Sequence, residues 1–535
     1  MNTIAPDTIT REQIAAAVAK ALGTVNVLPS VPDQLRWVEP PFGLAGPGSG
    51  RAQEPPVARL NQATSGWSSA SGGAGVSSAP AGGCCRPAPS ATVSYAEVTD
   101  GIFADVDAAV SAAVTAQRRY MRFPMAFRKR VVDVIRDFCR QPDNLQYMAE
   151  EAVRQTGMGN VHDKILKNRA VADLTPGVED LTTEAWSGDD GLTTIELSPF
   201  GVIGAITPTT NPTETILCNS IGMLASGNAV VFSPHPRAKD LSVWLIRRLN
   251  AALDAIGAPA NLVTMVAEPT IESTHELMVH PDVKLLVATG GPGIVKTVLS
   301  SGKKAIGAGA GNPPVVVDQT ADVEKAAKDI VDGCTFDNNL PCTSEKEVIA
   351  VDAITDLLIF NLIKQGAYQI TDPALLARLV DLVVDGGHAR TEWVGKSVGE
   401  ILRAVGVVPP PGTRVIIAET ELMHPFVQVE LMMPILPVVR ARDVDEAIDW
   451  AILCEHGNRH TAIMHSADVH ALTKMGRLIQ TTIFVKNGPS YAGLGIGGEG
   501  YITFTIAGPT GEGLTSAKTF TRKRRCTLVG GLNVR

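Results

Sequence analysis

A single cysteine in a polar setting is the residue of this chain best suited to nucleophilic chemistry. Cys342 lies in the segment FDNNLPCTSEKEV, directly after a polar loop that contains Asn338, Asn339 and Pro341. A thiol with the reference pKa of about 8.5 is mostly protonated at neutral pH unless a helix N-terminus or a cation helps. We expect CTSEKEV to start a helix whose free N–H groups favour the thiolate. A lone cysteine is most often a small buried hydrophobe, and that interpretation stays open at this point.

An asparagine at the end of an apolar run is a second candidate for chemistry. The stretch AITPTTNPTETI (205–216) enters Thr- and Pro-rich turns around Asn211. A side-chain amide at such a position can donate a hydrogen bond to a developing oxyanion, and losing such a donor costs roughly 3 to 4 kcal/mol in known cases. On this segment alone, a turn-forming Asn-Pro pair is the favoured interpretation.

Two glycine-rich segments are candidates for binding a phosphate. GLGIGGEG (493–500) contains a literal GxGxxG, but the residues after it alternate like a strand, so we interpret it as a loop. VATGGPGIV ends an apolar run with Thr289, Gly290 and Gly291, and a helical stretch begins at Ile294. Strand, turn and helix in this order suit a pyrophosphate, although an ordinary strand-to-helix turn has the same pattern.

The elements that must position these residues alternate between short apolar runs and helical stretches. Helical periodicity fills 106–140, and strand, crossover helix and strand then repeat, as in parallel doubly wound sheets. Ligands of such sheets bind beyond the carboxyl ends of the strands. The first set is predicted to have strands at 201–206, 228–233, 261–266 and 283–288, with helices at 237–256 and 275–279. The second set is predicted to have strands at 315–318, 347–352, 413–419 and 461–466.

Composition and charge narrow the classes of partner. The 535 residues carry a net charge of 47 − 55 = −8, so there is no basic field to hold nucleic acid. No apolar run reaches the roughly 18 to 20 residues of a membrane helix, and the N-terminus lacks a secretory signal. We therefore expect a cytoplasmic protein that binds neither nucleic acid nor membrane. Eight cysteines without a CxxC pair indicate reduced thiols rather than a disulfide framework, and no metal site is expected.

The first 92 residues differ in composition from the rest. Residues 1–23 are predicted to form a short amphipathic helix, because apolar residues from Ile14 to Leu22 fall on one helical face. Residues 24–92 are rich in Gly, Pro, Ser and Ala, a composition typical of disordered linkers. A tethered amphipathic helix favours docking to a partner.

Taken together, these segments resemble the aldehyde dehydrogenase superfamily, and specifically its coenzyme A-acylating branch, in particular the propionaldehyde and acetaldehyde dehydrogenases of bacterial microcompartments. The resemblance covers about 93–535 and rests on FDNNLPC, FSPHPRAK, ATGGPG, GAGAGNPP and the tail 495–521. It implies an α/β fold with three parts: a Rossmann-type nucleotide-binding domain at 93–313, an α/β catalytic domain at 314–487, and a β oligomerisation arm that combines 192–200 with the C-terminal return 488–535.

The resemblance also implies a role for each matching residue. Cys342 falls on the catalytic thiol and Asn211 on the oxyanion-hole amide, while Glu430 falls on the glutamate that binds a ribose. His460 could help to deprotonate an incoming thiol, or be a structural histidine in a loop before a strand. The residues implied for the dinucleotide are Thr207, Pro208, Ser233, Pro234, His235, Thr289, Gly290, Gly291, Glu430 and Pro434.

Two departures from the hydrolytic members refine the implied activity. Where those enzymes carry a glutamate that activates water, this chain has AIGAGAGNPP (305–314), so a thioester on Cys342 would persist until a thiol such as coenzyme A arrives. Ser233 also replaces a lysine in a Lys-Pro pair, which leaves NAD and NADP both open. The implied reaction is oxidation of a short-chain aldehyde to acyl-CoA with NAD. The alternatives are a hydrolytic aldehyde dehydrogenase and an inactive shell-associated interaction protein.

The resemblance extends to partners. It implies a homo-oligomer, a dimer or a tetramer, and a place inside a bacterial microcompartment, with residues 9–22 docking on a shell protein. The basic run 522–525 is interpreted as a solvated strand rather than a phosphate site.

Overall fold

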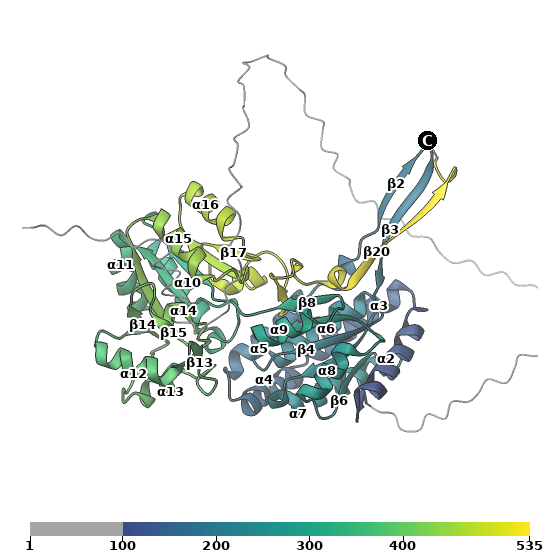
Figure 1. Ribbon diagram of the computed structural model, residues 1–535, viewed down its shortest axis with the longest axis horizontal. Coiled ribbons are helices and arrows are strands. Elements are labelled where there is room, and N and C mark those ends of the chain that lie inside the picture. Colours follow the sequence, from purple (N-terminus) through teal and green to yellow (C-terminus); the bar gives the residue numbers. More distant parts are fainter. Residues whose placement is uncertain (1–99, 535) are drawn as a thin grey trace, which may run out of the picture. The chain divides into compact units, whose positions relative to one another are not determined.

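Two parallel β-sheets organise the residues described by the computed structural model, 100–534 (Figure 1). These residues lie within one unit of the chain, Val98–Arg535. The predicted helix at 1–23 and the predicted linker at 24–92 lie outside the described residues. Among those that are described, every helix is too short or too polar to cross a membrane, and no three His, Cys, Asp or Glu side chains gather closely enough to hold a metal ion.

The first sheet reverses its strand order at the centre, next to β4. Chain order runs outward from β4 through β5 and β6 on one side and through β7 and β8 on the other, and every pair is parallel. Such a switch point leaves a crevice at the carboxyl ends of the strands. The spatial order is β1 (Ile102–Phe103), β6 (Val263–Val266), β5 (Ala229–Pro234), β4 (Val202–Thr207), β7 (Val283–Thr289) and β8 (Ala305–Ala308).

The helices around this sheet follow the apolar periodicity, with one correction. The single helical stretch predicted at 106–140 is two helices, because the chain leaves the helix at 121–124, where Pro124 disfavours helical backbone in the residue before it. The helices are α2 (Val106–Tyr120), α3 (Met125–Arg140), α4 (Pro142–Thr156), α5 (Val161–Leu174), α6 (Pro212–Ala225), α7 (Lys239–Asp254), α8 (Ile271–Val279) and α9 (Pro292–Leu299).

The second sheet is also parallel throughout, and its seven strands include all four predicted for it, within about two residues. Its order is β11 (Ala367–Gln369), β14 (Val415–Glu419), β15 (Ile435–Ala441), β10 (Glu347–Val351), β9 (Pro314–Val317), β16 (Thr461–His465) and β17 (Ile483–Lys486). Its helices are α10 (Val323–Thr335), α11 (Asp352–Lys364), α12 (Pro373–Val383), α13 (Val398–Ala404), α14 (Pro425–Gln428), α15 (Val444–Cys454) and α16 (Val469–Ile479).

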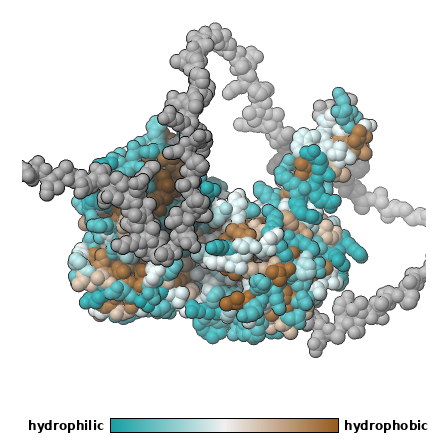
Figure 2. All heavy atoms as spheres, in the orientation of Figure 1, coloured by the Kyte–Doolittle hydropathy of each residue, from teal (hydrophilic) through white to brown (hydrophobic). Residues whose placement is uncertain are grey.

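A third, antiparallel sheet joins two distant parts of the chain (Figure 1). It has the order β2 (Glu184–Gly188), β3 (Gly191–Pro199) and β20 (Thr521–Val529), with Thr521 opposite Pro199 and Val529 opposite Gly191. The basic run 522–525 lies in β20 and is exposed, as predicted. In Figure 2 this sheet is a mixture of hydrophilic and intermediate residues with some hydrophobic ones near its end. Leu528 and Val529, the last two residues of β20, are exposed.

Short elements complete the described chain. The glycine-rich segment 493–500 begins with the last two residues of a turn of 3-10 helix, η4, and continues as a loop from Gly495, as predicted. The residues after it, 501–506, alternate like a strand in sequence, but only Ile506 lies in one, β18. The remaining elements are β12 (Val384–Asp385), β13 (His388–Ala389), β18 (Ile506–Ala507), β19 (Gly513–Leu514), η1 (Val178–Asp180), η2 (Pro236–Ala238), η3 (Phe336–Asn339), η4 (Ser490–Leu494) and η5 (Ala517–Phe520).

Candidate active site

A cavity of about 670 Å³ lies beyond the carboxyl ends of β4, β5 and β7. Its wall also includes Cys342 and Glu430, which come from loops of the second sheet. The cavity therefore occupies the crevice that the strand order predicts. All the residues proposed for the site line it except His460 and Pro434, namely Thr207, Pro208, Asn211, Ser233, Pro234, His235, Thr289, Gly290, Gly291, Cys342 and Glu430.

Cys342 is half-buried in a turn, and the prediction of a helix after it is wrong. The chain instead enters β10, whose β-branched and apolar residues pair with β9 and β15 in the middle of the sheet. The thiol has no helix N-terminus to lower its pKa. Burial, followed by the Glu430 carboxylate, raises the pKa of Cys342 to about 12, with the Lys346 ammonium opposing them. The resting sulfur is therefore a protonated thiol at neutral pH.

The polar loop before Cys342 is held in a strained backbone conformation. Asp337, Asn338 and Asn339 have φ values of 47°, 54° and 67°, in the left-handed region that Asn and Asp tolerate best after glycine. Asn339 Nδ2 donates to Cys334 O at 2.8 Å, and Lys346 Nζ donates to Asn339 Oδ1 at 2.6 Å. These asparagines therefore shape the turn that carries the sulfur and do not line the cavity themselves.

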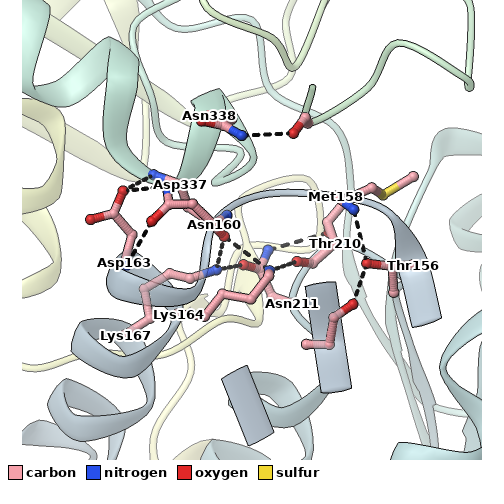
Figure 3. A network of polar contacts seen from close by, with 12 residues as sticks. Thr156, Met158, Asn160, Asp163, Lys164, Lys167, Thr210, Asn211, Asp337 and Asn338 are labelled. Atoms are coloured by element: carbon pink, nitrogen blue, oxygen red, sulfur yellow. Dashed lines mark hydrogen bonds and ion pairs between the residues drawn. The ribbon is translucent and has the colours of Figure 1, made fainter. Parts of the chain in front are cut away.

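Asn211 ends the β4–α6 turn with its amide orientation fixed by hydrogen bonds (Figure 3). It is 4% exposed and precedes Pro212, which occupies the first position of α6, where a missing N–H costs nothing. Its Oδ1 accepts a hydrogen bond from Lys167 Nζ at 2.5 Å, and its Nδ2 donates to Thr210 Oγ1 at 3.2 Å. One amide hydrogen is left for a ligand in the cavity that Asn211 lines.

Sequence reasoning missed the charged residues that lie behind Asn211. They come from α5, α6 and η3, so no local sequence motif contains them all. The one signal in the sequence was a pair of lysines three residues apart on a helical face whose other residues are buried. Buried lysines are rare unless they are paired. The residues are Lys164, Lys167, Glu214 and Asp337.

The strand ends of the first sheet offer polar groups suited to a dinucleotide. Thr207 Oγ1 is buried and has no hydrogen-bond partner among residues 100–534, so a ligand in the cavity can supply one. Gly291 caps α9, which places a helix N-terminus directly after β7, the arrangement predicted for this turn. Ser233 Oγ and Thr289 Oγ1 are engaged within the protein, with Thr274 and Thr505 at 2.8 Å each. The residues present fit a dinucleotide.

Glu430 is the one acidic side chain among the residues that line the cavity. Its Oε1 accepts a hydrogen bond from Gly311 N at 3.2 Å. Burial raises the pKa of its carboxyl group, while the Lys346 ammonium opposes that shift. Gly309 and Ala310 also line the cavity. They belong to the segment 305–314, where hydrolytic members of the resembled family carry a glutamate, and neither residue can activate water.

Two proposed residues lie outside the cavity. Gly311 packs against the His460 ring, and a Cβ built on Gly311 would lie 2.8 Å from His460 Cγ and from Cys342 O. His460 is 1% exposed, its Nδ1 is 2.9 Å from Thr461 Oγ1, and its Nε2 has no partner. Burial lowers the pKa of this histidine to about 3, so it is neutral. Pro434 is buried, and its carbonyl accepts a sheet hydrogen bond from Ile416 N.

Comparison with known proteins decides the family. The sequence model of the aldehyde dehydrogenase family matches residues 83–375. The chain is 50% identical over 436 residues to a CoA-propanoylating propanal dehydrogenase of Salmonella typhimurium, a match that covers 81% of this chain and 93% of the relative. The chain belongs to the aldehyde dehydrogenase family. The fold expected from the resemblance is thereby confirmed.

Two solved aldehyde dehydrogenases are similar over nearly the same span. The propionaldehyde dehydrogenase of Rhodopseudomonas palustris, with bound CoA and an acylated cysteine, has a TM-score of 0.81 and 63% identity and covers 82% of this chain and 100% of its own. A propionaldehyde dehydrogenase from the fucose utilisation bacterial microcompartment of Clostridium phytofermentans has a TM-score of 0.80 and 51% identity, and covers 81% of this chain and 100% of its own. A histidine-to-alanine and a cysteine-to-alanine mutant of that enzyme are also similar.

Proposed function

We propose that this aldehyde dehydrogenase oxidises a short-chain aldehyde to acyl-CoA with reduction of NAD, and that Cys342 carries the acyl group between the two steps. The observation that carries the proposal is the cavity, which Cys342 and Asn211 both line while residues 305–314 bring no carboxylate. The named relatives support the choice of acceptor, because one is CoA-propanoylating and another has an acylated cysteine with bound CoA.

In the first half of the reaction, Cys342 Sγ gives its proton to solvent water and attacks the carbonyl carbon of the aldehyde. The oxygen becomes an oxyanion, which accepts hydrogen bonds from Asn211 Nδ2 and from the Cys342 backbone N–H. Bound NAD supplies the acceptor for the hydride that leaves the same carbon. Thr207 and Glu430 would hold that dinucleotide in the cavity. Cys342 is left as a thioester.

In the second half, coenzyme A takes the acyl group. Its thiolate attacks the thioester carbon, the same two donors stabilise the second oxyanion, and Cys342 departs as a thiolate that takes up a proton. Water is a poorer nucleophile than a thiolate, and Gly309 and Ala310 offer it no base. Acyl transfer to coenzyme A is therefore favoured over hydrolysis.

We extend the site to His460, which lies behind Gly311. In the C. phytofermentans enzyme, the mutated histidine follows the mutated cysteine by the same number of residues as here, 460 − 342 = 118. With its pKa lowered to about 3, this imidazole is a weak base, but its Nε2, which has no partner among the described residues, can accept a hydrogen bond from a thiol that reaches it. This supports a role in the thiol-exchange half of the reaction.

A hydrolytic activity is the second candidate, and Glu430 is the observation that favours it. A carboxyl group with a raised pKa, sharing a cavity with the thioester, is a candidate base for water. Against this, Glu430 Oε1 accepts a hydrogen bond from Gly311 N, so this oxygen is already engaged within the protein. The product of the reaction separates the two candidates.

The experiment is NADH formation over a panel of short aldehydes, with and without coenzyme A, for the wild type and Cys342→Ala. We expect sustained turnover only with coenzyme A, acyl-CoA as the product, and no turnover by the variant, which should still bind NADH. Steady release of free acid without coenzyme A would identify the hydrolytic activity. NADH formation by Cys342→Ala would reject the assignment of the nucleophile.

We also propose that the protein is a homo-oligomer and is directed into a microcompartment through residues 9–22. The apolar tip of the β2–β3–β20 sheet supports the first proposal, and the microcompartment origin of the C. phytofermentans relative supports the second. Residues 9–22 lie outside the described part of the chain. Deleting 1–23 should abolish co-purification with shells, and unchanged co-purification would reject this targeting role.

A further inference from the structure

Four charged side chains form a buried cluster behind Asn211, and Figure 3 labels three of them, Lys164, Lys167 and Asp337. Lys164 and Lys167 come from α5, Glu214 from α6 and Asp337 from η3, and each side chain is at most 1% exposed. The cluster is balanced, with two positive and two negative groups. Burying a charge costs several kcal/mol per ion unless the charge is paired. A cluster of four buried charges therefore indicates a constraint beyond ordinary packing.

Lys167 places its ammonium group beside three oxygen atoms of this cluster. Its Nζ donates to Asn211 Oδ1 at 2.5 Å and contacts Asp337 Oδ2 at 2.6 Å and Glu214 Oε1 at 2.9 Å. Burial alone would lower the pKa of Lys167, but the carboxylates of Asp337 and Glu214 outweigh it and raise the pKa. The side chain is therefore a positive charge held between two carboxylates and the amide oxygen of Asn211.

This charge determines which way the amide of Asn211 faces. With Oδ1 on the ammonium, Nδ2 must point away from Lys167, toward Thr210 Oγ1 and the cavity. The flipped amide would place its N–H groups against a cation that has no lone pair to accept them. A charge-assisted hydrogen bond is roughly twice as strong as a neutral one, so the orientation is strongly preferred.

The same ammonium reaches the turn that carries the nucleophile. Asp337 lies five residues before Cys342 in FDNNLPC, with a φ of 47°. Its Oδ2 contacts Lys164 and Lys167, and its Oδ1 accepts a hydrogen bond from Asn160 N at 2.8 Å. Lys167 therefore ties the segment that provides one oxyanion donor to the segment that provides the other.

We propose that Lys167 is the positioning residue of the oxyanion hole: it holds the Asn211 amide with its N–H groups toward the cavity and fixes the Asp337 turn relative to it. This inference rests on the proposed function, which makes Asn211 Nδ2 a donor to the oxyanion. Lys167 touches neither substrate nor cofactor and acts through Asn211.

The test is a double-mutant cycle on kcat, with variants Lys167→Met, Asn211→Ala and the pair of both. Lys167→Met should lower kcat about 100-fold, the scale of one lost oxyanion donor, with KM for the aldehyde and affinity for NADH changed less than about threefold. Combined with Asn211→Ala, it should cause little further loss, because its effect passes through that amide.

Two further variants keep the test decisive. Lys164→Met is the matched control, since Lys164 lies on the same helix, is equally buried and contacts Asp337 and Thr210 O, but not Asn211. It should retain kcat within about fivefold, because it leaves the donor orientation intact. The double variant Lys167→Met/Glu214→Gln keeps the net charge of the cluster at zero. It therefore avoids the loss of stability that an unpaired buried carboxylate would cause.

The outcomes separate this inference from the function on which it rests. If Asn211→Ala kept the wild-type kcat, the proposal that Asn211 Nδ2 donates to the oxyanion would be rejected. A slow Asn211→Ala together with wild-type kcat in Lys167→Met/Glu214→Gln would overturn the role of Lys167 alone. Losses that multiply in the double variant, or an equal loss in Lys164→Met, would also overturn it, because either result indicates a structural effect that does not pass through Asn211.

Discussion

At the scale of single residues, the resting state of Cys342 was the least predictable feature. The sequence locates the sulfur, but its protonation depends on burial and on Glu430, which is 88 residues away (430 − 342 = 88). A nucleophile whose pKa is raised rather than lowered is unreactive until substrates change its surroundings. A thiol in this state is slow to undergo side reactions between turnovers.

Alkylation of the free enzyme by iodoacetamide tests this state. Because the pKa of Cys342 is raised to about 12, the thiolate fraction should grow about tenfold for each pH unit from 7 to 9, without a plateau. Glu430→Gln removes the carboxylate that raises this pKa, so it should speed alkylation at every pH. Peptide mass spectrometry reads Cys342 separately, and the exposed Cys526 in the same digest shows that the reagent is active. A plateau below pH 8 would contradict the raised pKa.

At the scale of elements, apolar periodicity predicted all three strands of the first sheet that end at the cavity, β4, β5 and β7, but fewer of the strands in the second sheet. It missed β15, because Pro437 interrupts the run ILPVVRA, and proline is normally confined to edge strands. Here β15 is central, between β14 and β10, and proline is tolerated where it pairs with Ala418. The helix expected after Cys342 was wrong because pairing with two neighbouring strands outweighs a local capping signal.

The charged cluster could not be predicted, because its members are brought together only by the packing of α5, α6 and η3. Nothing in the local sequence of Lys167 indicates that its partners lie 44 and 170 residues further along the chain (211 − 167 and 337 − 167). Positioning residues of this kind follow from the tertiary structure, whereas the nucleophile and the glycine turns carry recognisable local patterns.

Two glycines next to α4 test how tightly that packing is set. Gly159 has a φ of 77°, and a Cβ there would lie 2.1 Å from Asp337 Oδ1. Gly157 has a φ of 70°, but a Cβ there would meet nothing closer than 3.5 Å. Both alanine variants should lose about 1 kcal/mol of unfolding free energy to backbone strain.

Gly159→Ala should lose a further 1 to 3 kcal/mol or so from overpacking and should also lower kcat, because it displaces Asp337. Urea unfolding and steady-state kinetics measure both effects. Equal stability and equal kcat in Gly157→Ala and Gly159→Ala would show that the Asp337 turn tolerates displacement.

At the scale of the whole molecule, the β2–β3–β20 sheet is the feature that is hardest to explain for a monomer. Most of β20 is exposed, and Val529 at its end is 80% exposed. An exposed strand with an apolar end is a site for pairing with another chain. This agrees with the proposed oligomer.

Truncation after Phe520 tests that assignment by removing β20 while keeping the hydrogen bond from Asn228 Nδ2 to Phe520 O. We expect light scattering to report smaller particles than for the wild type. Lys523→Gln, which removes only the exposed ion pair with Glu184 at 3.3 Å, should leave the assembly unchanged. An unchanged mass after truncation would place the interface elsewhere.

The most direct test of the account is to look for the acyl group on Cys342. The enzyme is mixed with propionaldehyde and NAD in the absence of coenzyme A, quenched, digested and examined by mass spectrometry. We predict a burst of about one NADH per site, a propionyl group on the peptide that contains Cys342, and its transfer to propionyl-CoA when coenzyme A is added. A burst without acylation of Cys342, or release of the acyl group as propionate before coenzyme A arrives, would contradict the account.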